Sequence, residues 1–330
     1  MSDAAVNVSA ETNGRANHHA IAIGVIVLAA LLALPLLMND YRQYIINLML
    51  IYCLVSVGFN IVLGYLGQLA FANAALFGIG AYSTGILMEQ LDVPFWLALP
   101  SSALIGAIAG TLIGLPALRL KSYYLAIATL VFGELLRWAY IHGGELTRGS
   151  SGLPVSTATV FGFPIDTETR KYYVFLIVTL VMLWATRNLI RSRIGRAWVA
   201  IRENELAAAS LGISPALYKI AAFTWSGAVV GVAGALFAVL LGRIEPESFN
   251  LNQLLLHFTF VMIGGLGNMV GSILGSVVLT AAPEILRNFP GFEEIVFSLL
   301  LIGVLLFMPH GIGGLLVAHI SSLREKLFRE

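Results

Sequence analysis

Charged side chains are rare in the long apolar stretches of this sequence, and two of them lie close together. Glu134 and Arg137 fall inside an otherwise apolar run, and their spacing of three residues places them on one face of a helix. Ionisable groups inside a membrane segment are candidates for proton or substrate binding. Because the two charges can neutralise each other, we interpret them as a structural ion pair, with a proton or substrate role as the alternative.

Other reactive side chains do not form a catalytic set. Cys53 is the single cysteine, so the chain can form neither an internal disulfide nor a cysteine metal cluster. His257 is isolated in the sequence, and we assign it a structural role. No Gly-x-x-x-x-Gly-Lys-Ser/Thr phosphate-binding loop occurs anywhere in the chain. We therefore expect no cofactor, no metal, no bound nucleic acid and no enzymatic activity in this chain itself.

Three neutral polar side chains lie in or near two glycine-rich apolar segments. Gln68 and Asn73 precede residues 77–85, and Asn268 lies within residues 263–275. Small residues at spacings of three and four let helix backbones approach closely, which makes tight packing the simpler interpretation. The alternative is that both segments are irregular elements beside a translocation path lined by Gln68, Asn73 and Asn268.

The composition is that of a protein embedded in lipid. Hydrophobic residues make up 58% of the 330 residues and charged residues 11%, whereas soluble domains carry roughly 25% charged residues. The uncharged runs are continuous rather than alternating, which excludes a transmembrane β-barrel. We predict an all-α, polytopic transmembrane helix bundle with about eight full spans. These spans are expected at residues 20–38, twice within 43–88 with a joint at 64–68, and at 93–118, 123–141, 172–190, 220–242 and 295–317.

The distribution of Lys and Arg predicts the orientation. Basic residues outnumber acidic ones in the loop 187–219, so this loop is predicted to be cytoplasmic. The loop 142–171 is then extracytoplasmic, while the N-terminal extension 1–19 and the tail 319–330 are cytoplasmic. Counting the spans onward places residues 243–247 outside and the tail inside, and the last span accounts for one crossing. Residues 248–283 must therefore cross the membrane an even number of times. We therefore expect a glycine-broken re-entrant or hairpin element there.

The cytoplasmic loop contains a run that favours a short helix. Residues 202–212 are rich in alanine, and Gly212 followed by Pro215 ends the run. A helix lying on lipid headgroups would need a broad apolar face opposite Lys and Arg, whereas this run carries alanines and two acids. We expect it to dock onto a soluble partner. The predicted contact residues are Arg202, Glu203, Asn204, Glu205, Ala208 and Gly212.

Several short motifs follow one another in a fixed order between residues 44 and 315. They are Gly-Tyr-Leu-Gly-Gln-Leu-Ala-Phe at 64–71, Gly-Ile-Gly-Ala-Tyr at 78–82, Tyr-Leu-Ala-Ile-Ala-Thr-Leu at 124–130, Arg-Gly-Ser-Ser-Gly-Leu-Pro at 148–154, Ser-Arg-Ile-Gly-Arg-Ala-Trp-Val-Ala-Ile-Arg at 192–202, Gly-Gly-Leu-Gly at 264–267 and Met-Pro-His-Gly at 308–311. In this order they resemble the membrane permeases of branched-chain (hydrophobic) amino acid ABC importers.

The resemblance implies a permease domain over residues 20–318 that forms half of a heterodimeric pore with a second permease subunit. It also implies two cytoplasmic ATPase subunits, a periplasmic or lipid-anchored binding protein, and a location in the bacterial inner membrane. The helix from Glu205 to Gly212 would then be the coupling helix, seated in a groove of an ATPase subunit. The general importer signature has its glycine one residue closer to the acid, so Glu203 and Glu205 both remain open as the acidic contact.

Two alternatives to a branched-chain amino acid importer remain. A secondary transporter would couple to an ion gradient through an intramembrane carboxylate, for which Glu134 is the candidate in mid-span. Related ABC permeases carry urea, short amides or other small solutes. The neutral polar groups of the predicted path suit a net-neutral solute, because a zwitterion needs polar partners but no fixed counter-charge. We therefore expect leucine, isoleucine or valine first, and urea or a short amide second.

Overall fold

The computed structural model describes residues 31–120, 122–160, 162–286 and 311. The predicted last span, the N-terminal extension, the C-terminal tail and most of the predicted first span lie outside these residues. The described helices are η1 (Leu34–Leu37), α2 (Asp40–Asn60), the π-helical η2 (Ile61–Tyr65), α3 (Asn73–Glu89), α4 (Phe95–Gly114), η3 (Pro116–Leu118), α5 (Ser122–His142), η4 (Gly149–Ser151), α6 (Glu168–Arg191), α7 (Arg193–Glu203), α8 (Glu205–Ser210), α9 (Pro215–Leu241), η5 (Pro246–Phe249), α10 (Leu251–Gly264) and α11 (Met269–Leu286).

An all-α membrane bundle is confirmed, although the described residues do not give eight spans. Among the described residues, five helices are long and apolar enough to cross a bilayer, at residues 40–65, 95–118, 123–142, 168–191 and 215–241. The predicted span before residue 88 is shorter than expected, because an extended stretch precedes α3, which begins only at Asn73.

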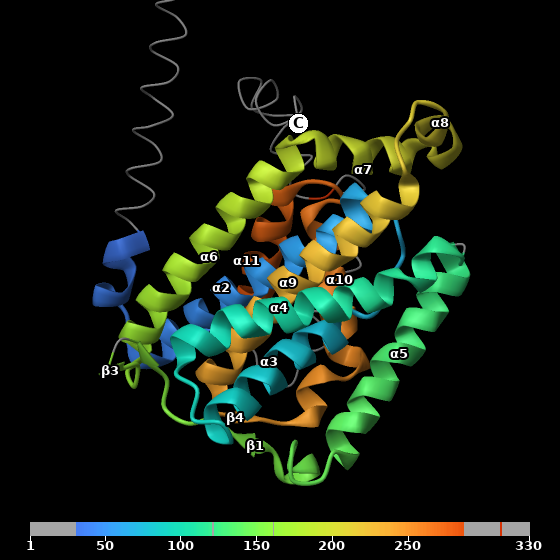
Figure 1. Cartoon of the computed structure of the whole chain (residues 1–330). Coiled ribbons are helices and arrows are strands. Elements are labelled where there is room, and N and C mark those ends of the chain that lie inside the picture. The colour runs from blue at the N-terminus through green and yellow to red at the C-terminus, as the bar shows by residue number, and fades with distance from the viewer. Residues whose placement is uncertain (1–30, 121, 161, 287–310, 312–330) are drawn as a thin grey trace, which may run out of the picture.

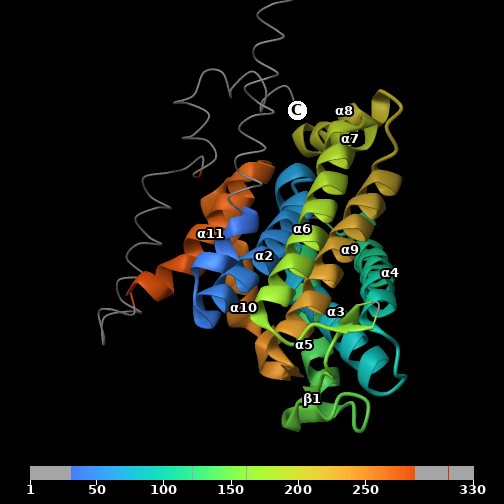
Figure 2. The same ribbon diagram turned by 90° about the vertical axis from the view of Figure 1, so that its left-hand side faces the viewer.

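The short strands lie at the opposite end of the bundle from α7 and α8, as both ribbon views show (Figures 1 and 2). Strand β1 (Leu153–Pro154) pairs antiparallel with β4 (Arg243–Ile244). Strand β2 (Thr159–Val160) pairs antiparallel with β3 (Phe163–Pro164). Apart from these two-residue strands and η4, the described residues between 143 and 167 have no regular structure, as their content of Gly, Ser and Pro predicts.

Helix α9 is the centre of the bundle and packs against α2, α3 and α4 (Figure 1). Glycines allow its backbone to touch that of its neighbours. Gly106 and Gly110 of α4 face Gly227 of α9, and Gly80 of α3 faces Gly231 of α9. Small residues permit this backbone-to-backbone packing where lipid supplies no hydrophobic driving force. The first glycine-rich segment, residues 77–85, is thus part of a regular helix, and its Gly80 serves close packing.

The second glycine-rich segment contains a turn. Helices α10 and α11 form a hairpin whose turn contains Gly265 and Gly267, at φ values of 110° and 72° that favour glycine. Helix α11 then runs antiparallel to α2: Ser272 bonds to Ser56 near the end of α2 at 3.0 Å, and Glu284 accepts from Tyr41 at its start at 2.7 Å. Of the two forms expected near residues 248–283, re-entrant or hairpin, residues 251–286 therefore form a hairpin.

The close packing of α4 on α9 predicts a steric effect. A Cβ added at Gly106 would collide with the Gly227 carbonyl oxygen, so the Gly106→Leu variant must push the two helices apart. We expect its free energy of unfolding to fall by about 1–3 kcal/mol. Unfolding of the purified chain in mixed micelles measures this effect. The control is Ile108→Phe, which adds bulk on an exposed position of α4 and should change little. Equal stability of both variants and the native chain would contradict the packing.

Candidate functional site

Helices α7 and α8 lie at one end of the bundle, and the chain bends between them at Asn204. Asn204 has an extended backbone, with φ −160° and ψ 108°, and its Oδ1 accepts a hydrogen bond from the Ala207 amide at 3.0 Å. Asparagine is among the best N-cap residues, so α8 starts at Glu205. The prediction of one helix across residues 202–212 is therefore wrong. Two helices meet at a bend, where Asn204 caps the second.

The end of α8 is defined by Gly212, which has a φ of 84°. The Gly212 amide donates to the Ala209 carbonyl at 3.0 Å, and the Ile213 amide donates to the Ala208 carbonyl at 3.1 Å. These two bonds form a Schellman motif, in which glycine takes the left-handed position without strain. Helix α8 therefore ends in a Schellman motif at Gly212, where the sequence predicts its end.

Two contacts join α7 and α8 to the start of α9. The indole Nε1 of the buried Trp198 donates to the Tyr218 carbonyl at 2.8 Å. The ammonium of Lys219, a side chain only 6% exposed, binds both carboxylate oxygens of Glu205 at 2.7 and 2.9 Å. From the sequence, Glu205 is predicted to contact a partner protein, and Lys219 is not predicted to be involved. Within the chain, Glu205 already serves as the counter-charge of a buried lysine.

A third contact joins α7 to the end of α2. Arg202 directs Nη1 toward the bundle and donates to the Gly64 carbonyl in η2 at 2.8 Å. Its Nη2 pairs with Glu203 at 2.9 Å, and the Glu203 side chain is 69% exposed. The outer surface of α8 is apolar rather than charged, because Leu206 is 84% exposed and Leu211, which follows the helix, is 82% exposed.

The three predicted path residues lie in different settings. Asn73 is buried in α3, with Nδ2 3.1 Å from His257 Nδ1, while its Oδ1 has no hydrogen-bond partner among the described residues. Gln68 is partly buried in the extended stretch before α3. Asn268 caps α11, because its Oδ1 accepts from the Gly271 amide at 2.9 Å. In this conformation the three side chains do not form one site.

His257 is the centre of a buried polar network that the sequence does not reveal. Its Nε2 lies 3.0 Å from the amide nitrogen of Gln253, which also donates to the Tyr52 hydroxyl at 3.0 Å. With Asn73 on its other ring nitrogen, His257 links α2, α3 and α10. These contacts are consistent with a structural role for His257. Although His257 is isolated in the sequence, it has polar neighbours in the folded chain.

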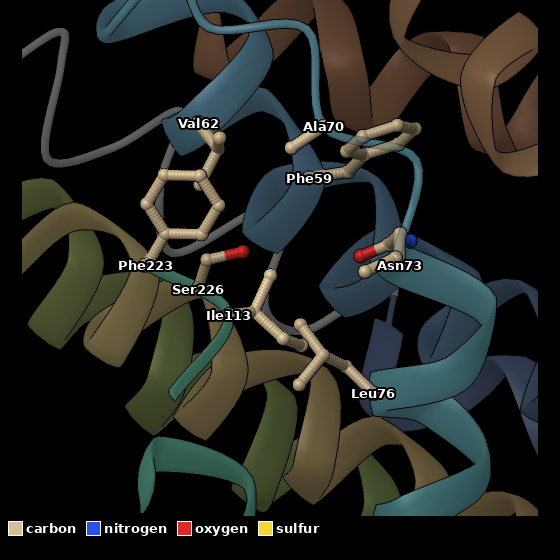
Figure 3. A pocket seen from close by; sticks show the side chains of 9 residues that line it. Phe59, Val62, Ala70, Asn73, Leu76, Ile113, Phe223 and Ser226 are labelled. Carbon is tan, nitrogen blue, oxygen red and sulfur yellow. The ribbon is translucent and has the colours of Figure 1, made fainter. Parts of the chain in front are cut away.

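A small cavity lies beside this network, between α2, α3, α4 and α9. Figure 3 shows Asn73 and Ser226 pointing into it from α3 and α9, while the other lining residues are apolar. Its volume of about 10 Å³ has room for a single water molecule and not for an amino acid. In this conformation the cavity is therefore too small to hold a substrate.

The ion pair of α5 includes a third member. Arg137 Nε lies 3.0 Å from Glu134, and Arg137 Nη1 lies 3.2 Å from Glu247 of η5. Two carboxylates around one guanidinium leave one negative charge in excess. Glu247 lies 110 residues from Arg137 in the sequence, so the sequence alone does not predict their contact.

The contact between Glu205 and Lys219 predicts a paired effect on stability. Glu205→Gln leaves a buried ammonium without its counter-charge, which should lower the free energy of unfolding by about 1–3 kcal/mol. Adding Lys219→Met to this variant should restore part of the loss, because no charge is then left unpaired. Thermal unfolding of the purified variants measures both effects. Glu203→Gln is the control, since its exposed pair should contribute little. If the double variant were no more stable than Glu205→Gln, the pair would not act as described.

Comparison with known proteins identifies the family of this chain. Residues 41–309 match the family model described as "Branched-chain amino acid transport system / permease component". The high-affinity branched-chain amino acid transport system permease protein LivM of Salmonella typhimurium is 33% identical over 310 residues, covering 87% of this chain and 73% of LivM. LivM of Escherichia coli is 32% identical over 314 residues, with 88% and 73% covered.

A second permease type also matches. The high-affinity branched-chain amino acid transport system permease protein LivH of Escherichia coli is 27% identical over 286 residues, covering 80% of this chain and 91% of LivH. Since the family match extends over most of the described helices and the LivM proteins are similar over most of their length, this chain belongs to the family of branched-chain amino acid transport system permease components.

Proposed function

We propose that this chain is one permease subunit of an ATP-driven importer for branched-chain amino acids in the bacterial inner membrane. The observation that carries the proposal is the family match over residues 41–309. The similarity to proteins named LivM and LivH supports pairing with a second permease subunit, because both names denote permeases of the same kind of transport system. A binding protein would deliver the substrate at the end of the bundle that carries β1 and β4.

ATP hydrolysis belongs to two partner subunits, one of which docks at α7 and α8 of this chain. The basic residues of the loop 187–219 support a cytoplasmic position for these helices. The exposed Leu206 and Leu211 offer an apolar contact, and Glu203 offers a charge at its edge. Glu205 is the weaker candidate for the acidic contact, since it already binds Lys219. Removing the two leucine side chains from water would favour such a contact.

The docking proposal predicts loss of the partner when α8 becomes charged. Leu206→Asp should weaken ATPase binding by roughly tenfold or more, because a carboxylate must be desolvated in the interface. The amount of ATPase that co-purifies with the tagged permease pair measures this loss. The matched control is Leu146→Asp, at an exposed leucine at the opposite end of the bundle. Equal loss in both variants, or in neither, would contradict docking at α8.

The substrate path is proposed to run past Gln68, Asn73 and Asn268. The unpartnered Oδ1 of the buried Asn73 supports this, because a buried polar atom without a partner is costly and is retained where another group binds it in turn. Neutral polar groups can hold the ammonium and carboxylate of a zwitterion. The cavity must widen during transport, since it is too small for leucine. Leucine, isoleucine and valine are the proposed substrates.

The source of energy and the substrate can be tested together. The full complex in liposomes should take up labelled leucine only when ATP is supplied, and collapse of the proton gradient should leave uptake unchanged. Glu134 supports this expectation, because its carboxylate is already engaged by Arg137. Labelled urea in the same vesicles serves as the second substrate. Uptake that follows the proton gradient would indicate a secondary transporter, and uptake of urea without leucine would overturn the amino-acid proposal.

A further inference from the structure

Arg202 lies against three glycines that come from two separate breaks in the helices. Its aliphatic stem covers Gly67, where an added Cβ would lie 2.5 Å from Arg202 Cγ. Its guanidinium donates to the Gly64 carbonyl at 2.8 Å. The same guanidinium covers Gly267 in the turn between α10 and α11, where an added Cβ would lie 2.8 Å from Nη1. A side chain at Gly67 or Gly267 would therefore displace Arg202. We name the contact of Arg202 with these three glycines the Arg202 clasp.

The two breaks beneath the clasp are also bound to each other. Asn60 Oδ1 accepts from the Gly267 amide at 2.9 Å, and Asn60 Nδ2 donates to the Asn268 carbonyl at 3.1 Å and to Ser272 Oγ at 2.7 Å. The Tyr65 hydroxyl accepts from the Met269 amide at 3.2 Å. The end of α2 and the hairpin turn therefore form one hydrogen-bonded junction.

Two other contacts of α7 and α8 lead to a different helix, α9. Trp198 and Glu205 hold them to the start of α9 through Tyr218 and Lys219. Arg202 extends this unit across to α2 and to the hairpin. Hydrogen bonds from a charged donor are stronger and more directional than neutral ones, so a displaced α7 would pull on the Gly64 carbonyl rather than slide past it.

We propose that Arg202 is a positioning residue that transmits movement of α7 and α8 to the junction of α2 with the α10–α11 turn, and so couples the cytoplasmic helices to the inner end of the path. This rests on the proposed function. From the sequence, Arg202 is predicted to lie at the interface with the ATPase. The direction of its guanidinium, toward Gly64 and Gly267, favours a role inside the permease instead.

The test uses the complete complex with the second permease and the ATPase subunits, in three variants. Arg202→Gln removes the charge, Arg202→Lys keeps a charge and an apolar stem, and Arg196→Gln is the control. Arg196 belongs to the same helix, is exposed, and donates to the Arg191 carbonyl within the loop. Three quantities are measured: co-purified ATPase, leucine uptake per ATP hydrolysed, and hydrogen exchange at residues 265–269 before and after vanadate trapping.

Arg202→Gln should retain its ATPase subunits and their basal ATP turnover, while uptake per ATP falls roughly tenfold or more, since a charge-assisted bond is lost. Vanadate should change exchange at residues 265–269 in the native complex and in Arg196→Gln, but not in Arg202→Gln. Arg202→Lys should fall between them. A merely structural role would raise exchange in both states and leave the vanadate response intact.

Two results would overturn the proposal. If Arg202→Gln loses its ATPase subunits, Arg202 is a docking contact. If the vanadate response of residues 265–269 in Arg202→Gln matches the native complex, the clasp transmits nothing. A native complex that carries no leucine would refute the proposed function, yet the exchange measurement would still decide on the clasp, because it does not depend on the substrate.

Discussion

Backbone groups left open where a helix breaks must find hydrogen-bond partners, and this requirement organises the end of the bundle near α7. Buried backbone groups without a partner cost free energy, so other parts of the protein bind them. The amide of Asn60 binds the exposed groups of the hairpin turn, and the guanidinium of Arg202 binds the Gly64 carbonyl. Because each partner comes from another helix, satisfying the breaks also ties α2, α7 and the hairpin together.

Close packing along α9 gives this junction a firm support. Glycines bring α3 and α4 into backbone contact with α9, and interiors packed this densely transmit displacement instead of absorbing it. The same helix begins beside Lys219, which holds α8 through Glu205. A force applied to α8 therefore reaches the middle of the bundle through α9 and reaches the hairpin turn through Arg202. The two routes start from one short unit, which suits a coupling element better than a surface anchor.

The sequence was sufficient for features that depend on local composition. Apolar length predicted the helices at 95–118 and 123–142 closely, and the glycine content of residues 248–283 predicted the break between α10 and α11. The even number of crossings expected from the charge distribution stays a prediction. Contacts between distant residues could not be read in the same way. Asn73 and His257 are 184 residues apart, and Glu205 meets Lys219 only after the chain turns at Gly212. Arg202 was identified from its motif, but the direction of its side chain follows from the fold.

The most direct test of the central claim is a pair of distances between spin labels in the complete complex. Labels at Ser210 in α8 and Leu266 in the hairpin turn report whether these elements move as one body, and both residues are exposed. A second pair, at Leu266 and Leu146, spans the two ends of the bundle. Vanadate trapping should leave the first distance unchanged and alter the second. A change in the first distance with a constant second distance would contradict a rigid connection between α8 and the turn.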